Sequence, residues 1–549
     1  MEPVKHNGHF MKIHDLLINT AQAFPDRIAV SHEDRRITFA GLNSASDRLA
    51  EYLRPLAIKP GDRAGILFEN GIEYVVLFFA ALKAGLVAVP LDTSLGADSL
   101  GKILTDCDAR LLFAQTKFRR KLPELLKENK TIRTIISDKH LGTGRDDLPA
   151  IPLESIIGDP SRYSEPHQPG EELPPVQSSP LDMSDASASD TPHELAAVFY
   201  TSGSTGAGKG VMLSHRNLVS NTVGTMQYLK LTPNDSVLVI LPFYYIYGNS
   251  LLLTHVACGG RLVIDNRFLY PEVVLDTMEQ EKTTGFSGVP SNFLILLGNS
   301  TFAARKLEHL RYFTQAGGAM APETIRRLIS VFGHKEIFIM YGQTEAAPRV
   351  TWLPPERLNE KVGSIGIAVP GVTIEVLDDN DHPVPVGETG EIVVSGPNVM
   401  MGYWNQPADN AEVLRNGKLH TGDLAKQDAD GYFWVVGRKK EIIKSGGNRV
   451  SAKEIEECLL ANELILEACV VGVPDNILGE AIRAVIVLKS GRESNAKEIQ
   501  AYCKKHLADF KVPKQIVFVS ELPKYQSGKV NKPLLKTEEF RAPAHKHAT

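Results

Sequence analysis

The segment best suited to binding a phosphate lies between residues 200 and 210. It combines glycines, which let the backbone approach a ligand and adopt positive φ, with hydroxyls and a lysine that can donate hydrogen bonds. The residues expected to bind phosphate are Thr201, Ser202, Gly203, Ser204, Thr205, Gly206 and Lys209. A strand-like run, residues 195–199, precedes the segment, and a helix capped by Ser214 is expected to follow it. A strand, a glycine-rich turn and a helix start together predict an anion-binding site.

The same segment fits a P-loop except at one position. Residues 203–209 match the first seven positions of G-x-x-x-x-G-K-[ST], and the eighth is Gly210. A P-loop ATPase uses a hydroxyl at that position to bind Mg²⁺. The glycine therefore disfavours a P-loop ATPase or phosphotransferase, which would release ADP. Taken alone, the motif also fits a Gly/Ser surface loop that binds nothing.

The composition is that of a large globular enzyme. A chain of 549 residues suggests about two to four structural units, and a net charge of −5 gives no sign of nucleic-acid binding. The five cysteines have no C-x-x-C spacing, which argues against a zinc site and favours a cytoplasmic location. We expect no secretion signal and no transmembrane segment, because the apolar run at residues 75–89 is short and contains Lys83.

Residues 11–160 alternate between helix-like and strand-like segments. The helix-like segments are residues 13–23, 42–53 and 73–84, and the strand-like segments are residues 28–32, 63–67 and 86–90. This alternation predicts a parallel sheet with helices on its faces. Residues 159–192 are rich in Ser, Pro, Asp and Glu, which predicts a flexible linker.

Seven motifs along the chain carry a family resemblance. In order, they are residues 201–209, Tyr341-Gly-Gln-Thr-Glu345, residues 390–397, Gly402-Tyr-Trp404, His420-Thr-Gly-Asp423, residues 437–444 and residues 523–529. The set resembles the adenylate-forming superfamily of acyl-CoA synthetases, carrier-protein adenylation domains and beetle luciferase, and is closest to the fatty-acyl-CoA synthetases. The resemblance extends from about residue 13 to residue 535.

The resemblance implies an α/β fold in two domains. Residues 1–438 would form an AMP-binding domain of parallel-rich sheets flanked by helices, together with a distorted β-barrel. Residues 439–549 would form a small, mobile α+β domain that carries the catalytic lysine. The active site would lie between the two domains.

The chemistry implied by the resemblance is acid activation. A carboxylate is a poor acylating agent because its leaving group would be oxide. Attack on the α-phosphate of ATP gives an acyl-adenylate, from which AMP leaves readily when the thiol of CoA attacks. The protein must supply alignment and positive charge. The predicted enzyme is therefore an ATP-dependent acid–thiol ligase that uses Mg²⁺ and CoA and releases AMP and pyrophosphate.

The family roles transfer to particular residues of this sequence. Lys529 would be the catalytic lysine, Thr344 would bind the α-phosphate, and Glu345 would be the Mg²⁺ ligand, since a carboxylate suits a hard cation. Tyr341 would lie against the adenine, and Asp423 and Arg438 would bind the ribose. The remaining residues predicted to bind nucleotide or CoA are Gly317, Gly318, Gly342, Gln343 and Lys444.

The family also implies a hinge, at the position occupied here by Lys440. Rotation there would withdraw Lys529 after adenylation and bring the segment that begins at Lys444 to the site for thioester formation. One active site would then serve both half-reactions.

The acyl pocket departs from the family pattern at one position. The family often carries a histidine where this chain has Tyr245. No aspartate lies within residues 241–248, which disfavours an amino-acid substrate because a buried ammonium needs a partner. The predicted lining favours a fatty or aryl acid, above all a medium- or long-chain fatty acid. That lining is Tyr245, Asn249, Gly288, Phe293 and Gly317.

Two alternatives to a CoA ligase stay open besides the P-loop enzyme. A stand-alone adenylating enzyme would pass the acyl group to the phosphopantetheine of a carrier protein. A relative without activity would bind nucleotide only, although the presence of Glu345, Asp423, Arg438 and Lys529 opposes this alternative. A homodimer is compatible with the sequence.

Overall fold

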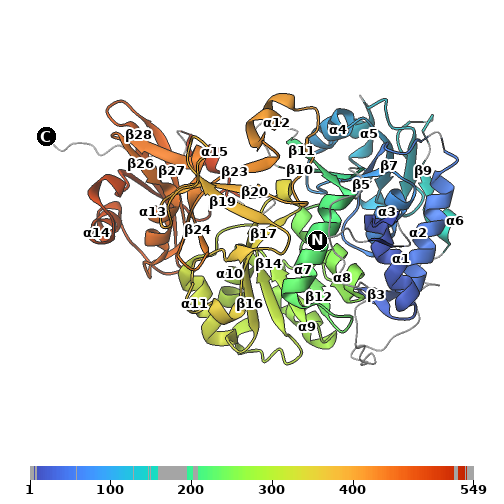
Figure 1. Ribbon diagram of the computed structural model, residues 1–549, viewed down its shortest axis with the longest axis horizontal. Helices are drawn as coiled ribbons and strands as arrows, with labels where there is room; N and C mark the ends of the chain where they lie inside the picture. Colours follow the sequence, from blue (N-terminus) through green and yellow to red (C-terminus); the bar gives the residue numbers. More distant parts are fainter. Residues whose placement is uncertain are drawn as a thin grey trace.

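The computed structural model of the protein describes residues 5–6, 9–56, 58–127, 129–145, 147–148, 150–158, 194–201, 208–524, 530–537 and 540. The predicted linker at residues 159–192, the phosphate-binding residues 202–206 and Lys529 lie outside the described residues. Four sheets of five or more strands carry the fold, and the sequence colours of Figure 1 run from the blue part at the right to the orange and red part at the left.

The first large sheet has eight strands, most of them parallel. Its strands are, in spatial order, β21 (Gly402–Tyr403), β11 (Lys209–Ser214), β10 (Leu195–Thr201), β6 (Val87–Pro90), β5 (Arg63–Leu67), β7 (Ala109–Ala114), β8 (Thr134–Ser137) and β9 (Ala150–Pro152). The strands from β10 to β9 pair in parallel, whereas β11 pairs antiparallel with both β10 and β21. The predicted parallel sheet is confirmed for the N-terminal part of the chain.

The second large sheet has nine strands and a parallel centre. Its strands are β18 (Ile367–Ala368), β17 (Arg349–Leu353), β16 (Glu336–Gly342), β15 (Tyr312–Gln315), β14 (Gly285–Gly288), β12 (Ser236–Val239), β13 (Arg261–Ile264), β3 (Ile28–His32) and β4 (Arg35–Thr38). The six strands from β16 to β3 pair in parallel, and antiparallel strands close both edges.

Helices fill the space around and between these two sheets. The helix α3 (Ile72–Lys83) packs against β5 and β6 of the first sheet and against β3 of the second, and ten of its residues are buried. An all-round apolar helix of this kind is a core element. Next to it, α1 (Ile13–Ala23), α2 (Phe39–Leu53), α7 (His215–Leu229) and α8 (Ile246–Cys258) pack on one another. Among the described helices, none has both the length and the apolar character needed to span a bilayer.

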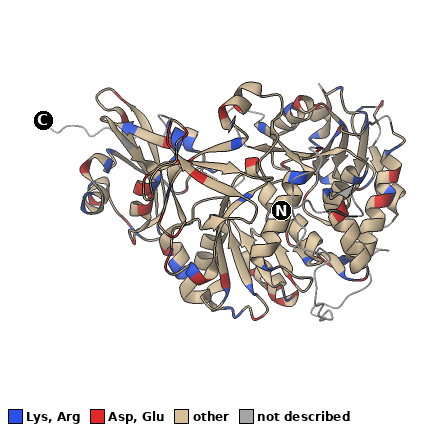
Figure 2. Ribbon diagram, viewed as in Figure 1, with Lys and Arg blue, Asp and Glu red and all other residues tan. Residues whose placement is uncertain are grey.

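Further helices flank the outer faces of the sheets. These are α4 (Ala97–Asp106), α5 (Leu122–Lys127), α6 (Glu154–Ile157), α9 (Pro271–Gln280), α10 (Pro290–Asn299) and α11 (Pro322–Phe332). Together with the two sheets they confirm the α/β class of the fold. Acidic and basic residues are interspersed over the whole molecule (Figure 2).

A smaller antiparallel sheet follows in the chain, in the place of the predicted barrel. Its strands are β19 (Thr373–Leu377), β20 (Gly390–Ser395), β22 (Leu414–Arg415), β23 (Lys418–Gln427) and β24 (Phe433–Arg438). The short helix α12 (Pro407–Val413) packs beside it and against β21. These elements lie between the large sheets and the C-terminal part of the chain (Figure 1).

The C-terminal part of the chain combines a five-stranded sheet with helices, as α+β folds do. Its strands are β25 (Ile442–Ser445), β26 (Asn448–Ser451), β27 (Ile465–Asp475), β28 (Gly479–Leu488) and β29 (Gln515–Phe518), and its helices are α13 (Ala452–Leu460), α14 (Ala496–His506) and α15 (Lys532–Leu535). The Ser451 hydroxyl and the Lys453 ammonium donate to the carbonyls of Val436 and Val435 on β24. These contacts hold the C-terminal sheet against the end of the preceding one.

Two features differ from the sequence-based expectation. The helix α2 begins at Phe39 rather than at residue 42, because the Thr38 hydroxyl caps it by accepting from the Gly41 N–H at 3.1 Å. The expected step from the phosphate loop directly into a helix is wrong. Strand β11 comes between them, and its register pairs Thr201 with Lys209, so the loop connects the two strands of a hairpin. Ser214 caps α7 as predicted.

Candidate active site

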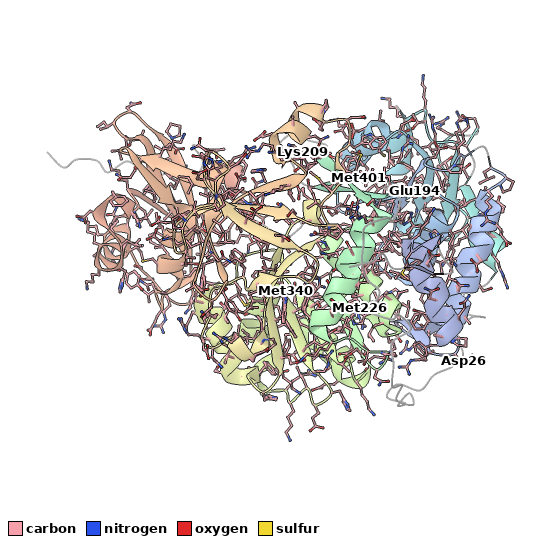
Figure 3. The ribbon with its side chains drawn as sticks, in the orientation of Figure 1. Asp26, Glu194, Lys209, Met226, Met340 and Met401 are labelled. Carbon is pink, nitrogen blue, oxygen red and sulfur yellow. The ribbon has the colours of Figure 1, made fainter. Side chains whose placement is uncertain are left out.

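The β10–β11 hairpin places Lys209 at the base of the predicted phosphate loop. The Lys209 ammonium contacts the Asp409 carboxylate on α12 at 2.5 Å and lies 4.9 Å from the centroid of the Tyr403 ring. Figure 3 labels Lys209 beside α12, close to Met401, whose N–H donates to the Met212 carbonyl on β11 at 3.0 Å. The hairpin and α12 therefore bring one cation and one carboxylate together at this end of the first sheet.

Tyr403 connects this hairpin to the motif that contains Glu345. Its hydroxyl donates to Glu345 Oε1 at 2.8 Å, and its strand β21 pairs with β11. Burial and then the charge of Glu345 raise the pKa of Tyr403, so the phenol stays protonated and donates. The Met400 N–H also donates to the Glu345 carbonyl at 2.9 Å. Glu345, the predicted metal ligand, and Lys209 therefore both contact the side chain of Tyr403, one at its hydroxyl and the other at its ring.

Tyr341, Asp423 and Arg438 form one hydrogen-bonded group. The Tyr341 hydroxyl donates to Asp423 Oδ2 at 2.6 Å, and Arg438 Nε donates to Asp423 Oδ1 at 2.8 Å. The Asp423 side chain is 5% exposed, whereas that of Arg438 is 56% exposed. A buried carboxylate is thus compensated by one guanidinium and one phenol. The structure brings together the three residues predicted to bind adenine and ribose, although they come from β16, β23 and β24.

Gly342 and the turn after it fix the direction of the Thr344–Glu345 segment. A Cβ atom on Gly342 would lie 1.8 Å from the Pro348 carbonyl oxygen, so only glycine allows this close approach. The chain then forms the short 3₁₀ helix η5 (Thr344–Ala346), passes through a cis peptide between Ala347 and Pro348, and returns as β17. Gln343 precedes η5, and both Gln343 and Thr344 are partly exposed.

Glu345 fits a magnesium ion that is also bound by a nucleotide. Mg²⁺ usually takes one or two carboxylates together with phosphate oxygens and water. Among the described residues, no cluster of three or more His, Cys, Asp or Glu side chains could hold a metal by itself. Glu345 is a single half-buried carboxylate, and Lys209 lies near enough to bind phosphate oxygens. This arrangement suits a magnesium ion that the protein and the nucleotide bind together, and not one bound by protein ligands alone.

The predicted acyl pocket residues lie at the ends of β14 and β15 and at the start of α8. Gly288 is the last residue of β14. Gly317, with a φ of 82°, and Gly318 follow β15. Tyr245 precedes α8, and its hydroxyl donates to Asp92 Oδ2 at 3.0 Å. A carboxylate therefore does border residues 241–248, but it comes from the loop after β6.

The other two predicted pocket residues are fully buried. The Phe293 ring on α10 packs against the rings of Phe286 and Phe313, with centroids 5.6 and 6.2 Å away, in the aromatic core of the second sheet. Asn249 lies on the inner side of α8, beside the Tyr74 hydroxyl of α3. Neither side chain is exposed, and both are part of the interior packing.

The predicted hinge residue is exposed. Lys440 lies in the 3₁₀ turn η7 (Lys439–Glu441), between the last strand of the antiparallel sheet and β25. Its side chain is 85% exposed, and its ammonium is 3.3 Å from Glu412 of α12. Lys444 lies on β25, at the base of the hairpin with Gly446 and Gly447, and is also exposed.

Sequence reasoning missed several contacts of the site. Tyr403 belongs to the Gly402-Tyr-Trp404 motif, but that motif gave no role to its hydroxyl. Asp409 and Asp92 had no signal of their own, because neither lies in a motif. Their partners Lys209 and Tyr245 are 200 and 153 residues away along the chain. Only the tertiary fold brings them together.

The chain matches known families and proteins along nearly its whole length. Residues 17–404 match the family described as AMP-binding enzyme, and residues 454–529 match the AMP-binding enzyme C-terminal domain. A feruloyl-CoA synthase of Amycolatopsis sp is 34% identical over 524 residues, which cover 94% of this chain and 96% of the relative. A long-chain-fatty-acid–CoA ligase of Bacillus subtilis is 30% identical over 538 residues, with 96% and 94% covered.

Solved structures show the same arrangement. ATP-bound MatB of Rhodopseudomonas palustris has a TM-score of 0.81 and 28% identity, over 96% of this chain and 98% of that one. The o-succinylbenzoate CoA synthetase (MenE) of Bacillus subtilis, solved with ATP and magnesium, has a TM-score of 0.78 and 28% identity, over 95% and 99%. The chain therefore belongs to the AMP-binding enzyme family, the adenylate-forming superfamily, and within it to the AMP-forming ligases of the acyl-CoA synthetase group.

Proposed function

We propose that this enzyme activates a carboxylic acid with ATP and Mg²⁺ and transfers the acyl group to the thiol of CoA. The observation that carries the proposal is the arrangement around β16. Tyr341, at its end, binds Asp423, and Glu345, four residues later, lies beside Tyr403 and the Lys209 hairpin. One nucleotide would place its sugar at Asp423 and its phosphates between Glu345 and Lys209.

In the first half-reaction, a carboxylate oxygen of the acid attacks the α-phosphorus of ATP, and pyrophosphate leaves with the electron pair of the broken P–O bond. The product is the acyl-adenylate. A bound magnesium ion would neutralise phosphate charge beside Glu345. Lys209 would offset the charge of the departing pyrophosphate, and Thr344 would donate to the α-phosphate. We propose Lys529 as the catalytic lysine, and this assignment rests only on the family resemblance.

In the second half-reaction, the CoA thiolate attacks the acyl carbon and AMP leaves. We propose that Lys440 is the hinge that separates the two steps. We also propose that the segment starting at Lys444 lies beside the thiol during the second step. The exposure of Lys440 supports the hinge, because an unpacked turn can change its dihedral angles without disrupting a core. The exposure of Lys444 on β25 makes its side chain accessible to CoA.

We further propose that the acid is a medium- or long-chain fatty acid or an aryl acid. The relatives are named for both kinds of acid: a feruloyl-CoA synthase and a long-chain-fatty-acid–CoA ligase. Gly288 ends β14 and Gly317 follows β15, so neither position adds a side chain to the predicted pocket. An aromatic wall that includes Tyr245 suits a largely apolar substrate.

The experiment that tests the function is a product assay. The purified chain is incubated with Mg²⁺, ATP and a panel of carboxylic acids, with either CoA or a phosphopantetheinylated carrier protein as the thiol. We expect pyrophosphate and AMP in equal amounts, and an acyl thioester with CoA. Release of ADP would contradict the proposal. Transfer to the carrier protein but not to CoA would show that the proposed acceptor is wrong, while the proposed adenylation step would still hold.

A further inference from the structure

Asp409 is a carboxylate whose described partner is the lysine that would bind phosphate. It lies in the first turn of α12, and its Oδ1 is 2.5 Å from Lys209 Nζ. Among the described residues, Lys209 is the only donor found to this carboxylate. The side chains of Lys209 and Asp409 are 31% and 29% exposed. Both members of the pair are therefore accessible from solvent.

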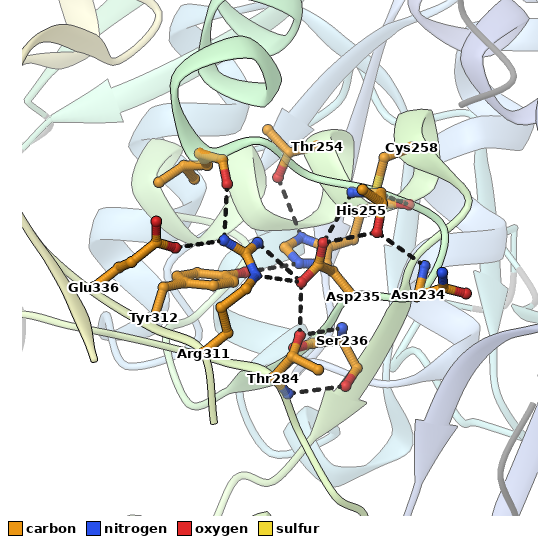
Figure 4. Close-up of polar contacts among 12 residues, drawn as sticks. Asn234, Asp235, Ser236, Thr254, His255, Cys258, Thr284, Arg311, Tyr312 and Glu336 are labelled. Atoms are coloured by element: carbon orange, nitrogen blue, oxygen red, sulfur yellow. Dashed lines mark hydrogen bonds and ion pairs between the residues drawn. The ribbon is translucent and has the colours of Figure 1, made fainter. Parts of the chain in front are cut away.

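A carboxylate that serves only the fold has a different environment in this protein. Figure 4 shows Asp235, which accepts from Arg311 Nε and Nη2 at 3.1 and 2.9 Å and from the Thr284 hydroxyl at 3.0 Å. The Asp235 side chain is 6% exposed. Several donors and burial hold this carboxylate in one arrangement. The pair of Asp409 with Lys209 rests on one donor and is more exposed, so it can exchange partners.

The residue after Asp409 fixes α12 on the hairpin. The Tyr403 N–H donates to Asn410 Oδ1 at 2.6 Å, and Asn410 Nδ2 donates to the Tyr403 carbonyl at 3.0 Å. Tyr403 lies on β21, which pairs with the strand that begins at Lys209. The backbone on both sides of the ion pair is thus held in place. A change of partner needs only rotations within the flexible lysine side chain.

The surroundings of Lys209 carry an excess of negative charge. Burial raises the pKa of Tyr403, and three nearby carboxylates raise it further: those of Glu345, Asp409 and Glu412. The Lys209 ammonium lies 4.9 Å from the centroid of the same ring. A polyphosphate that binds Lys209 therefore enters a region where like charges repel it.

Asp409 differs from the other two carboxylates once a phosphate is bound. Glu412 keeps Lys440 at 3.3 Å, and Glu345 would gain Mg²⁺. Asp409 would lose Lys209 to the phosphate oxygens and stay beside them without a cation. The ion pair and the bound polyphosphate therefore compete for one ammonium, and the pair favours the site without pyrophosphate.

We propose that Asp409 is a positioning residue that exchanges with phosphate on Lys209: it holds the ammonium before ATP binds and takes it back as pyrophosphate leaves. This inference rests on the proposed function and adds to it a residue that acts on pyrophosphate release. Bound pyrophosphate can attack the acyl-adenylate and re-form ATP and the acid. Return of Lys209 to Asp409 disfavours that reversal before CoA reacts.

The test measures ligand binding by titration calorimetry without acid or CoA. The ligands are Mg²⁺–ATP, Mg²⁺–pyrophosphate and AMP, and the variant is Asp409→Asn, which keeps the shape and removes the charge. We expect ATP and pyrophosphate to bind about fivefold more tightly to the variant, the size of a partly exposed ion pair. AMP lacks the β- and γ-phosphates and should bind equally to both proteins.

A general weakening of α12 cannot produce this result, because it would reduce the affinity for all three ligands. Unchanged or weaker binding of pyrophosphate to Asp409→Asn would overturn the exchange, and so would an equal gain for AMP. Failure of the wild type to bind ATP would instead refute the proposed function. In turnover, pyrophosphate should inhibit Asp409→Asn at a concentration about fivefold lower than the wild type.

Glu412→Gln is the matched control on the same helix. It also removes one negative charge, but its carboxylate contacts Lys440 and not Lys209. We expect its affinities for ATP and pyrophosphate to stay within about twofold of the wild type. An equal gain in Glu412→Gln and Asp409→Asn would show that only the net charge of α12 matters, and would refute the exchange.

A double-mutant cycle tests whether Asp409 acts through Lys209. In a Lys209→Gln background, Asp409→Asn should change the affinity for pyrophosphate by less than about twofold, because the shared cation is absent. A gain of about fivefold that persists there would contradict the proposal. Asp409→Ala also removes the carboxylate and suits a helix, so it replaces Asp409→Asn in both experiments if that variant does not fold.

Discussion

Two tyrosine hydroxyls orient the two carboxylates on which the proposed chemistry depends. Tyr403 donates to Glu345 at 2.8 Å, and Tyr341 donates to Asp423 at 2.6 Å. Burial and the adjacent carboxylate raise the pKa of both phenols, so both remain donors at neutral pH. A carboxylate that accepts from a fixed donor presents its remaining lone pairs in a defined direction, toward a metal or a sugar.

Tyr403→Phe tests the first of these contacts. The variant removes the hydroxyl from Glu345 and keeps the ring beside Lys209. We expect kcat/KM for Mg²⁺–ATP to fall about tenfold, because a hydrogen bond to a charged group contributes about 1.5 kcal/mol. Pyrophosphate release at varied Mg²⁺–ATP concentration measures the change.

Tyr200→Phe is the matched control for that variant. The Tyr200 hydroxyl also donates to a carboxylate, Asp106 at 2.6 Å, on the same hairpin but away from Glu345. We expect activity within about twofold of the wild type, because this part-buried hydrogen bond does not involve Glu345. Equal losses in Tyr200→Phe and Tyr403→Phe would mean that the hydroxyl supports the hairpin and not the carboxylate.

At the level of elements, the junction of α1 and α7 depends on a neutral histidine. His215 Nδ1 accepts from the Ile13 N–H at 3.1 Å, which only an unprotonated ring nitrogen can do. Burial, followed by the charge of His14, lowers the pKa of His215 to about 3. The folded protein therefore keeps this ring neutral at a pH where the unfolded chain protonates it.

The sign of the resulting pH dependence follows from proton uptake by the unfolded state. Below about pH 6.5 the unfolded chain binds a proton that the folded chain does not, so stability falls as the pH drops toward 3. Between pH 7.5 and 5.5 this histidine should reduce the free energy of unfolding by about 1.4 kcal/mol. In His215→Gln, which keeps an acceptor without titrating, the decrease measured by urea unfolding should be smaller by that amount. An unchanged decrease would contradict the assignment.

The turn η7 is the element on which the two-step cycle depends. Lys440→Pro fits the φ of a 3₁₀ turn and restricts rotation there. We expect ATP–pyrophosphate exchange to stay within a few-fold of the wild type and thioester formation to fall by at least about 100-fold. Lys440→Ala, which removes the contact with Glu412 and keeps the backbone free, should support both steps. Equal loss of both steps in Lys440→Pro would reject the hinge.

At the level of the whole molecule, the C-terminal sheet is held on β24 by contacts that a disulfide can replace. A Cβ atom on Gly437 would lie 3.9 Å from Ser451 Cβ, which is the spacing found in disulfides. Oxidised Gly437→Cys/Ser451→Cys should therefore lock the present arrangement. We expect overall acyl-CoA formation to be lost on oxidation and restored by a thiol reductant, with one half-reaction still active. Full turnover of the oxidised protein would show that no rearrangement is needed; Ser451→Cys alone is the control.

The sequence by itself determined the class of fold, the order of the motifs and the residues with the right chemistry for adenylation. These signals are local: apolar periodicity specifies helices and strands, and Gly342 or the cap at Ser214 acts within a few residues. The step from the phosphate loop into a helix was wrong because short alternating strands such as β11 become evident only beside their partners.

Only the tertiary structure decided which polar side chains contact one another. Tyr403 and Glu345 are 58 residues apart, Tyr341 and Asp423 are 82 apart, and Asp92 reaches Tyr245 across 153 residues. Electrostatic pairing acts through space and not along the chain, so no local pattern encodes it.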